Sequence, residues 1–522
     1  MFYIIGSGHA GVSAAVALIN RGMKVTMLDV GFELEKDKTE LLTKINSLDK
    51  DDWDDEIIKK LKGNMDVHSQ GVKVKNIYGS DYPYRGIKRY QPVKQNKSSM
   101  VRSLAKGGLS NVWGASILPY QSRDINDWPI GIKELELHYR AVLSFMPISG
   151  FEDDLASEYP LYSSVDSFQI SRQISNFMGD MLLNKDLLKG QGFSFGHSRL
   201  AVNFKSMNRK RGCNYCGLCL YGCPYGLIYS SCQTLDWLMD NPKFKYISGV
   251  LVKRLTEKND EVEITATDLN RNKNKIFKCS RVLLGAGTVS STRILLESMD
   301  AYNRPVYFKH SDHFQIPLLR YDKIDNVMTE RIHTLTQMFI ELYDKRISEN
   351  TIHMQCYSYN DLYLNVLNKM FGPLTKIFDK NIENFLGKLL IIKGYLHSDI
   401  SSEIVGYLEP GSNGSFVLQG KPNHIASTAL KKIKSKFSRN KKYFQAIPSP
   451  VFTKLSQPGI GNHSGSTFPM RKNPSEFESD LYGRPYGFKN VHLIDSTVFP
   501  SIPATTISLS IMANAHRIAS HI

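Results

Sequence analysis

The chain opens with a glycine-rich turn placed between two runs of apolar residues. Residues 2–5 predict a short buried strand, Gly6-Ser-Gly8-His-Ala-Gly11 follows it, and a run of small residues then predicts a helix. In such a G-x-G-x-x-G turn the first glycine bends the chain, the second lets a pyrophosphate approach the backbone, and the third lets the helix pack on the strand. The next predicted strand ends at Asp29, 18 residues after Gly11, where a carboxylate can bind a ribose hydroxyl. We therefore predict a Rossmann-like α/β domain that binds a dinucleotide, and the turn alone does not separate FAD from NAD.

Length and cysteine usage limit the class of protein. The chain has 522 residues, 42% of them hydrophobic, which is enough for two domains or for one large domain with an insertion. No signal peptide is recognisable, and no run of 18 apolar residues is present, so we expect a cytoplasmic protein without a membrane span. Three of the seven cysteines, Cys232, Cys279 and Cys356, are scattered along the chain, which argues against a disulfide framework.

The net charge of +16 is concentrated in part in residues 431–442, KKIKSKFSRNKK. Upstream, residues 361–396 are apolar at rough helical spacing, with lysines between the apolar positions. A solvated surface is one explanation of the charge. The two segments also fit peripheral contact with the inner face of an anionic membrane, or the binding of a phosphate-bearing substrate. We expect no nucleic-acid partner, because no recognition module accompanies the charge.

Four further segments narrow the choice of cofactor. They read AKGGLSNVWGA at 105–115, RVLLGAGTVSSTRILLES from Arg281, NHSGSTFPM at 462–470, and VHLIDSTVFPSIPATTISLSIMANAHRIA at 491–519. In this order, after an N-terminal nucleotide turn, they resemble the glucose-methanol-choline family of FAD-dependent oxidoreductases. The resemblance covers the whole chain in outline and is looser in 310–455.

This resemblance implies a particular architecture. The family has an FAD-binding domain assembled from discontinuous segments and an α+β substrate domain with an antiparallel or mixed sheet. The corresponding ranges here are 1–130, 196–300 and 456–522 for the FAD-binding domain, 131–195 for a lid or part of the substrate domain, and 301–455 for the substrate domain.

The resemblance also implies FAD, a small-molecule alcohol substrate, sugar-like or lipid-like, and contacts for the flavin. Gly107, Gly108, Ser110 and Asn111 would lie against the flavin ring, where backbone amides can contact the edge that is reduced. Two more positions carried over from the family are Val252, at the adenine end, and Asp495, near the ribityl chain or the pyrophosphate.

His463, within H-x-x-S-T-x-x-M, matches the catalytic histidine of the family. Alcohol oxidation needs a group that accepts the hydroxyl proton as hydride leaves, and imidazole suits that role near neutral pH. Where the family usually has a second histidine or an asparagine, this chain has Thr506, which can hydrogen-bond an alcohol but cannot act as a base. His310 and His313 are alternative partners by their place in the sequence alone.

Cys213, Cys216, Cys219 and Cys223 follow the spacing C-x2-C-x2-C-x3-C-P of bacterial ferredoxins, within a predicted loop at 205–232. The spacing favours a [4Fe–4S] or [3Fe–4S] cluster, with Cys223 or Cys232 as the fourth ligand of the larger one. A zinc site is less favoured because two separated knuckles are missing, and a loop without metal stays open.

A cluster would decide the class of oxidoreductase. A one-electron carrier beside the flavin favours a dehydrogenase that passes electrons to a protein or a quinone over an oxidase that uses oxygen. Two alternatives remain: a reductase working in the opposite direction, and a catalytically silent flavoprotein that carries electrons.

Overall fold

The computed structural model describes residues 1–522 apart from 64–67, 70–71, 74, 207–210, 365–371, 373–378, 412–414 and 450–451, and describes only the backbone of 68–69, 72–73 and 379–380. All statements below concern the described residues.

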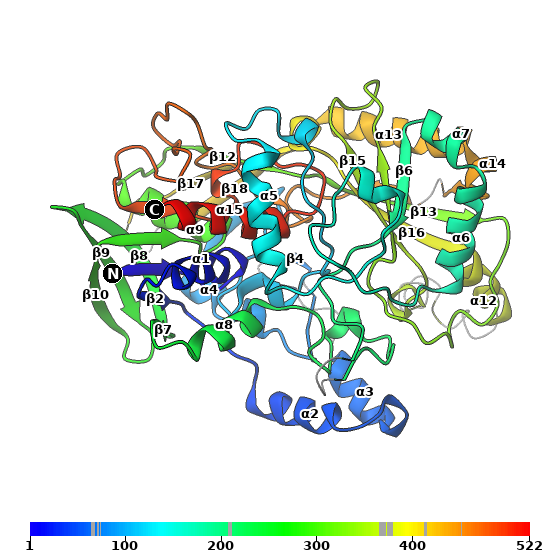
Figure 1. Cartoon of the computed structure of the whole chain (residues 1–522), viewed down its shortest axis with the longest axis horizontal. Coiled ribbons are helices and arrows are strands. Elements are labelled where there is room, and N and C mark those ends of the chain that lie inside the picture. Colours follow the sequence, from blue (N-terminus) through cyan, green and yellow to red (C-terminus); the bar gives the residue numbers. More distant parts are fainter. Residues whose placement is uncertain are drawn as a thin grey trace.

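A parallel five-stranded sheet lies in the half of the molecule that is expected to bind the nucleotide, at the left of Figure 1. Its order is β22 (Val491–Leu493), β11 (Arg281–Leu284), β1 (Phe2–Ile5), β2 (Val25–Leu28) and β7 (Phe244–Ile247). The strands are short and apolar because both faces are covered, as in other doubly wound sheets. Helix α1 (His9–Asn20) packs against the last helix, α15 (Ser508–His521). The sheet therefore joins distant segments of the chain, and the predicted Rossmann-like fold class is confirmed.

A three-stranded antiparallel sheet continues from β7. It consists of β8 (Val250–Lys258), β9 (Glu261–Asp268) and β10 (Lys273–Cys279), and α9 (Thr288–Ser298) packs against β8. Backbone hydrogen bonds from Val250 to Asp29, at 2.9 Å, and from Gly249 to Val30, at 3.0 Å, tie the start of β8 to the end of β2. These bonds fix the three-stranded sheet beside Asp29, where the ribose of the dinucleotide is expected to bind.

Two antiparallel or mixed sheets form the other half. One has the order β21 (Ser464–Gly465), β12 (Val306–His310), β17 (Glu403–Leu408), β18 (Phe416–Lys421) and β5 (Val93–Asn96). The other has the order β19 (Ala446–Pro448), β13 (His313–Arg320), β16 (Leu389–Tyr395), β15 (Ile352–Tyr357), β14 (Met338–Leu342) and β6 (Phe193–His197), with β20 (Lys454–Leu455) also paired to β13. This second sheet is antiparallel throughout, as expected for the substrate domain.

Helices cover one face of the seven-stranded sheet, at the right of Figure 1. They are α6 (Arg172–Leu183), α13 (His424–Arg439) and α14 (Lys441–Phe444). Their apolar residues share a core with Ile316, Ile392 and Met354 of the sheet. Because side chains alternate along a strand, the residues between these face the other way, toward the nucleotide-binding half.

The remaining elements lie mainly in connections. The helices are α2 (Lys36–Asn46), α3 (Asp55–Lys62), α4 (Ile87–Tyr90), α5 (Ile132–Leu143), α7 (Lys185–Gly190), α8 (Ser231–Met239) and α12 (Asp379–Lys388). A small ribbon pairs β3 (His68–Ser69) with β4 (Val72–Lys73).

The helical spacing of residues 361–396 suggests an apolar helix that contacts a membrane surface. This expectation is wrong for the C-terminal end of the segment. Residues 389–395 form the central strand β16, where Leu390 and Ile392 are fully buried. Residues 365–371 and 373–378 of this segment lie outside the described residues. Among the helices that the structure describes, none is long and apolar enough to cross a membrane.

Candidate active site

The dinucleotide turn has the geometry that its three glycines predict. Gly6 has φ +97°, and a Cβ on Gly11 would lie only 1.9 Å from the Gly6 carbonyl oxygen. A Cβ on Gly8 would meet nothing closer than the Gly107 oxygen, at 3.9 Å. Gly8 precedes α1, and no side chain caps the helix. The first amides of α1 therefore lack a side-chain cap, which leaves them available to a pyrophosphate.

Asp29 lies at the centre of a hydrogen-bond network. Its carboxylate accepts from the hydroxyls of Ser7 and Tyr246, the latter at 3.1 Å, and the Gly107 amide donates to Ser7 Oγ at 2.8 Å. Burial raises the pKa of Asp29 to about 6, against the lowering effect of these hydroxyls. A carboxylate accepts hydrogen bonds from hydroxyl groups, so a ribose-binding role for Asp29 stays a prediction.

The predicted flavin loop lies against the dinucleotide turn. A Cβ on Gly108 would lie 3.5 Å from the Gly8 Cα, so the two loops face each other. Ser110 Oγ donates to the Gly107 oxygen at 2.6 Å, and Asn111 Nδ2 donates to the Gly108 oxygen at 2.9 Å. These bonds hold the loop in the short η3 turn (Gly108–Asn111). The structure thus brings together six of the predicted FAD residues: Gly6, Gly8, Gly107, Gly108, Ser110 and Asn111.

Cys232 packs against this loop. A Cβ on Gly107 would lie 2.7 Å from Cys232 Sγ, and Sγ is 3.3 Å from the Lys106 oxygen. Gly107 has φ +81°, a conformation that also favours glycine. The scattered cysteine at 232 therefore packs directly on the loop expected to face the flavin.

Asp495 is buried and fully occupied by protein donors. It accepts from the Gly287 amide at 3.0 Å, from Ser291 Oγ at 2.6 Å, and from the amide and hydroxyl of Thr497 at 3.1 and 2.7 Å. Its place at the turn that starts α9 fixes the second glycine segment beside the first, where Gly285 contacts Gly6. Val252 is buried in β8, beside an irregularity in the pairing with β9.

His463 contacts the polar face of the seven-stranded sheet. Its ring stacks on Tyr395, with centroids 4.6 Å apart and planes at 19°. Tyr395 lies opposite His313 on one side and His353 on the other in the strand register. His353 Nδ1 lies 2.6 Å from Glu341 Oε1, and Glu341 also accepts from the Tyr159 hydroxyl at 3.2 Å.

Electrostatics keep the His463 imidazole neutral. Burial, with a smaller contribution from the charge of His353, lowers its pKa to about 3. Its Nδ1 is buried without a hydrogen-bond partner in the part of the chain that the structure describes. A neutral ring with an unpartnered nitrogen can accept a proton from a substrate.

The segment next to His463 connects the two halves of the molecule. The carbonyl oxygen of Ser464 accepts from Thr288 Oγ1, at the start of α9, at 3.1 Å and from Ser496 Oγ at 2.6 Å. Because α9 follows the second glycine turn, His463 is held between the glycine turns and the polar sheet face.

Thr506 has a defined structural partner. Its Oγ1 accepts from the Leu118 amide at 2.8 Å in a buried environment. Of the two histidines considered as alternatives, His313 contacts Tyr395, with ring centroids 5.2 Å apart. His310 is buried with Nε2 3.7 Å from Asp312.

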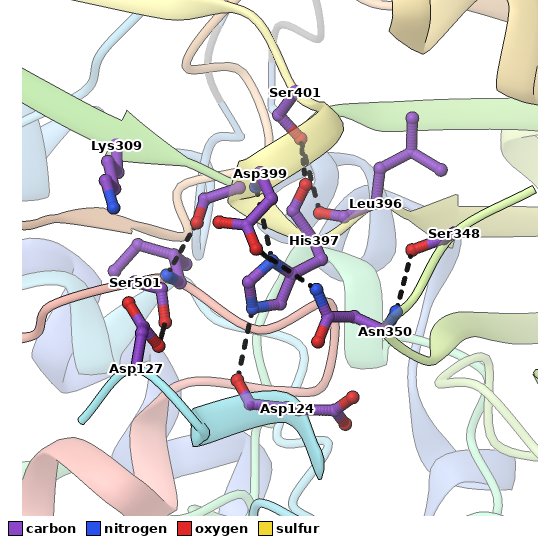
Figure 2. Close-up of polar contacts among 12 residues, drawn as sticks. Asp124, Asp127, Lys309, Ser348, Asn350, Leu396, His397, Asp399, Ser401 and Ser501 are labelled. Carbon is purple, nitrogen blue, oxygen red and sulfur yellow. Dashed lines mark hydrogen bonds and ion pairs between the residues drawn. The ribbon is translucent and has the colours of Figure 1, made fainter. Parts of the chain in front are cut away.

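A polar junction anchors the chain just before Thr506. Figure 2 shows His397 between the Asp124 carbonyl oxygen, at 3.1 Å, and the Asp399 carboxylate, at 3.3 Å. In the same view Ser501 donates to Asp127 at 2.6 Å. The end of β16 and the segment leading to α15 are thus fixed to one another.

The four clustered cysteines share one loop around η6 (Cys219–Tyr221), and all seven cysteines are free. Burial raises the pKa of Cys216 to about 12 and that of Cys223 to about 11, and the charge of Cys219 adds to both shifts. Even so, among the described residues no three or more His, Cys, Asp or Glu side chains are gathered closely enough to hold a metal ion. Four thiols at this spacing are donors of the kind that an iron–sulfur cluster uses.

The fold is similar to that of solved structures at low sequence identity. Pyridoxine 4-oxidase from Mesorbium loti matches with a TM-score of 0.60 and 13% identity, over 99% of this chain and 98% of that chain. Formate oxidase matches with a TM-score of 0.62 and 13% identity, over 99% and 97%. A variant of formate oxidase from Aspergillus oryzae RIB40, studied for its FAD modification, gives the same values. Comparison with family models finds no match, and neither does comparison with curated proteins.

These likenesses establish the fold over the whole chain. They agree with the architecture that the resemblance to the glucose-methanol-choline family implies. Several site residues did not emerge from the sequence: Ser7, Tyr246, Glu341, His353 and Tyr395. The last three meet only through the register of the antiparallel sheet, which a single sequence does not reveal.

Proposed function

We propose that this protein is an FAD-dependent oxidoreductase that oxidises an alcohol, sugar-like or lipid-like, to a carbonyl compound. The observation that carries the proposal is the place of His463, between the glycine turns that suit FAD and the polar sheet face. In this proposal 1–130, 196–300 and 456–522 hold the cofactor, and 131–195 with 301–455 hold the substrate.

Each residue of the proposed active site would have a separate role. The turns at Gly6 and Gly107 hold FAD, which when bound supplies the hydride acceptor. His463, neutral near pH 7, takes the hydroxyl proton of the substrate. The ring of Tyr395 keeps the imidazole in place, and His353 is held by Glu341. Thr506 positions the backbone at Leu118 rather than acting as a base.

The test is anaerobic mixing of the flavin-loaded protein with a panel of alcohols, followed by flavin absorbance. Bleaching by an alcohol, lost in His463→Asn with FAD retained, supports the proposal. If carbonyl compounds oxidise the reduced flavin but alcohols do not reduce the oxidised flavin, the reductase alternative is favoured. Unchanged flavin reduction in His463→Asn would leave an electron-carrying flavoprotein.

We further propose that Cys213, Cys216, Cys219 and Cys223 bind an iron–sulfur cluster. The support is the ferredoxin spacing and the gathering of the four thiols, one buried and three partly buried, in one loop. Metal binding would have to displace protons from thiols whose pKa values are raised and draw the loop together. Such a cluster would suit electron delivery to a protein or a quinone.

Iron and acid-labile sulfide in anaerobically purified protein measure this directly, and no activity assay is needed. Roughly three or four irons per chain are expected for this spacing. Cys216→Ser should lose them, while Cys279→Ser, at a buried cysteine outside the loop, should keep them. Protein free of iron after reconstitution would make the four thiols structural.

Peripheral membrane contact is proposed for the outer face of α13. Lys431 and Lys432 of α13 and Lys441 and Lys442 of the adjoining α14 are exposed, whereas Lys436 is buried in an ion pair with Asp344. On neighbouring α6, Leu183 is 87% exposed. Exposed cations and an exposed leucine both suit an anionic lipid surface. Flotation with anionic vesicles, with and without charge reversal of these four lysines, tests membrane contact. No binding at low salt would contradict the proposal.

A further inference from the structure

The polar face of the seven-stranded sheet carries a row of side chains that the chemistry at His463 does not use. Lys454 of β20 lies opposite Gln315 of β13, and Gln315 lies opposite Lys393 of β16. Residues directly opposite each other in neighbouring strands share a face, with Cβ atoms about 5 Å apart. The row therefore places Gln315 between two lysine residues.

This row is open to solvent. Along β13 and β16, His313, Gln315, Lys393 and Tyr395 are partly exposed, whereas the residues between them are buried on the helical side. The nucleotide-binding half therefore does not seal this part of the sheet.

The positive charge of the row is not neutralised by the protein. Neither Lys393 nor Lys454 forms an ion pair with a carboxylate in the described part of the chain, and the Lys393 ammonium lies over the ring of Tyr357 at 4.8 Å. The carboxylate of the adjoining row, Glu341, is already engaged by His353 and Tyr159. Burial lowers the pKa of Lys393, and the charges of Lys393 and Lys454 add to burial in lowering that of His313.

A half-buried ammonium without a partner is unfavourable, and a bound anion removes the penalty. Two lysines, which act as point charges, match the two negative charges of a phosphate monoester, whereas a carboxylate carries one and is better matched by the planar fork of arginine. The amide of Gln315 can add a hydrogen bond between them.

We propose that Lys393, Gln315 and Lys454 bind a phosphate group of the substrate. The row lies two residues along the strand from the row of His313, Tyr395 and His353, a separation of about 7 Å. The substrate class is then a phosphorylated hydroxy compound with its phosphate a few bonds from the carbon that is oxidised. This inference rests on the proposed function for its site, but phosphate binding can be measured without turnover.

The experiment is thermal unfolding and calorimetric titration of the FAD-loaded protein with inorganic phosphate at constant ionic strength. Bound FAD occupies the dinucleotide turn, so phosphate cannot bind there instead. Wild type should be stabilised by phosphate, as any ligand selective for the folded state stabilises it. Lys393→Gln and Lys454→Gln should each weaken phosphate binding roughly 10- to 100-fold.

Matched variants make the result specific. Lys431→Gln removes the same charge from the exposed face of α13 and should bind phosphate like wild type, and Lys393→Arg should retain most of the affinity. Loss of binding in Lys454→Gln supports the proposal even if Lys393→Gln does not fold. Equal binding in wild type and both glutamine variants overturns it, as does stabilisation by acetate equal to that by phosphate. If no alcohol reduces the flavin but phosphate binding depends on Lys393, the proposed oxidation fails and the anion site stands.

Discussion

The rings of Tyr395 and His463 stack with their centroids 4.6 Å apart, although Tyr395 ends β16 and His463 lies just before β21 of another sheet. The contact holds an imidazole that has no hydrogen-bond partner at Nδ1 among the described residues. We expect His463→Asn to lower kcat by roughly 10²- to 10⁴-fold, the range for loss of a general base. FAD content should be unchanged, and stopped-flow measurement of flavin reduction checks both.

Tyr395→Leu is the companion variant. It removes the stacked ring but no ionisable group that takes the substrate proton, so kcat should fall less than in His463→Asn. A kcat as low as that of His463→Asn would mean that Tyr395 takes part in the chemistry.

The pH dependence follows from the lowered pKa of His463. With a pKa of about 3 in the unliganded protein, the imidazole stays unprotonated down to pH values well below 6.5. The profile of kcat/KM, which reports free enzyme and substrate, should therefore lack an acid limb near 6.5. A fall with a midpoint near 6.5 that is unaffected by substitution of His313 would contradict this assignment.

Alanine substitutions at Gly8 and Gly11 should affect two different properties, FAD binding and folding stability respectively. A Cβ at Gly11 would collide with the Gly6 oxygen at 1.9 Å, whereas a Cβ at Gly8 meets only the Gly107 oxygen, at 3.9 Å. Gly11→Ala should therefore destabilise even the flavin-free protein, by a few kcal/mol, as expected for overpacking. Gly8→Ala should leave its stability unchanged and weaken FAD binding. Denaturant unfolding without FAD, with flavin fluorescence titration, measures the two effects.

The segments that carry local signals were the predictable part of this molecule. The glycine turn at 6–11 and Asp29 follow from spacing alone, because turn geometry and phosphate approach require particular residues there. The strand at 389–395 did not, because its apolar residues fit a helical spacing as well as a buried strand, and pairing with distant strands decides between them. The neighbours of Glu341, His353 and Lys393 depend on strand register across the sheet, and the local sequence carries no signal for that register.

Thr506 distinguishes a structural hydroxyl from a catalytic one. Its Oγ1 accepts from the Leu118 amide, so Thr506→Val should leave a buried amide unpaired and cost about 1–3 kcal/mol of unfolding free energy. Thr506→Ser keeps the acceptor and should restore stability and most of kcat. Wild-type stability with a large loss of kcat in Thr506→Val would instead support a direct role toward the substrate.

His333 makes the fold sensitive to acid. The side chain is fully buried against Phe168, Phe204 and Tyr215, both ring nitrogens lack partners among the described residues, and burial lowers its pKa to about 3. The folded state resists protonation that the unfolded chain accepts near 6.5, so this contribution to stability is present above pH 6.5 and is lost as pH falls toward 3.

For His333 the loss between pH 7 and pH 5 is about 2 kcal/mol, from the pKa difference. His333→Phe should therefore lose about 2 kcal/mol less than wild type over this interval, while the other buried histidines contribute equally to both. His424→Ala, at the exposed start of α13, serves as the control and should behave like wild type. Urea unfolding at the two pH values measures the difference. An identical pH dependence in wild type and His333→Phe would show that the imidazole is protonated or solvated in the folded protein.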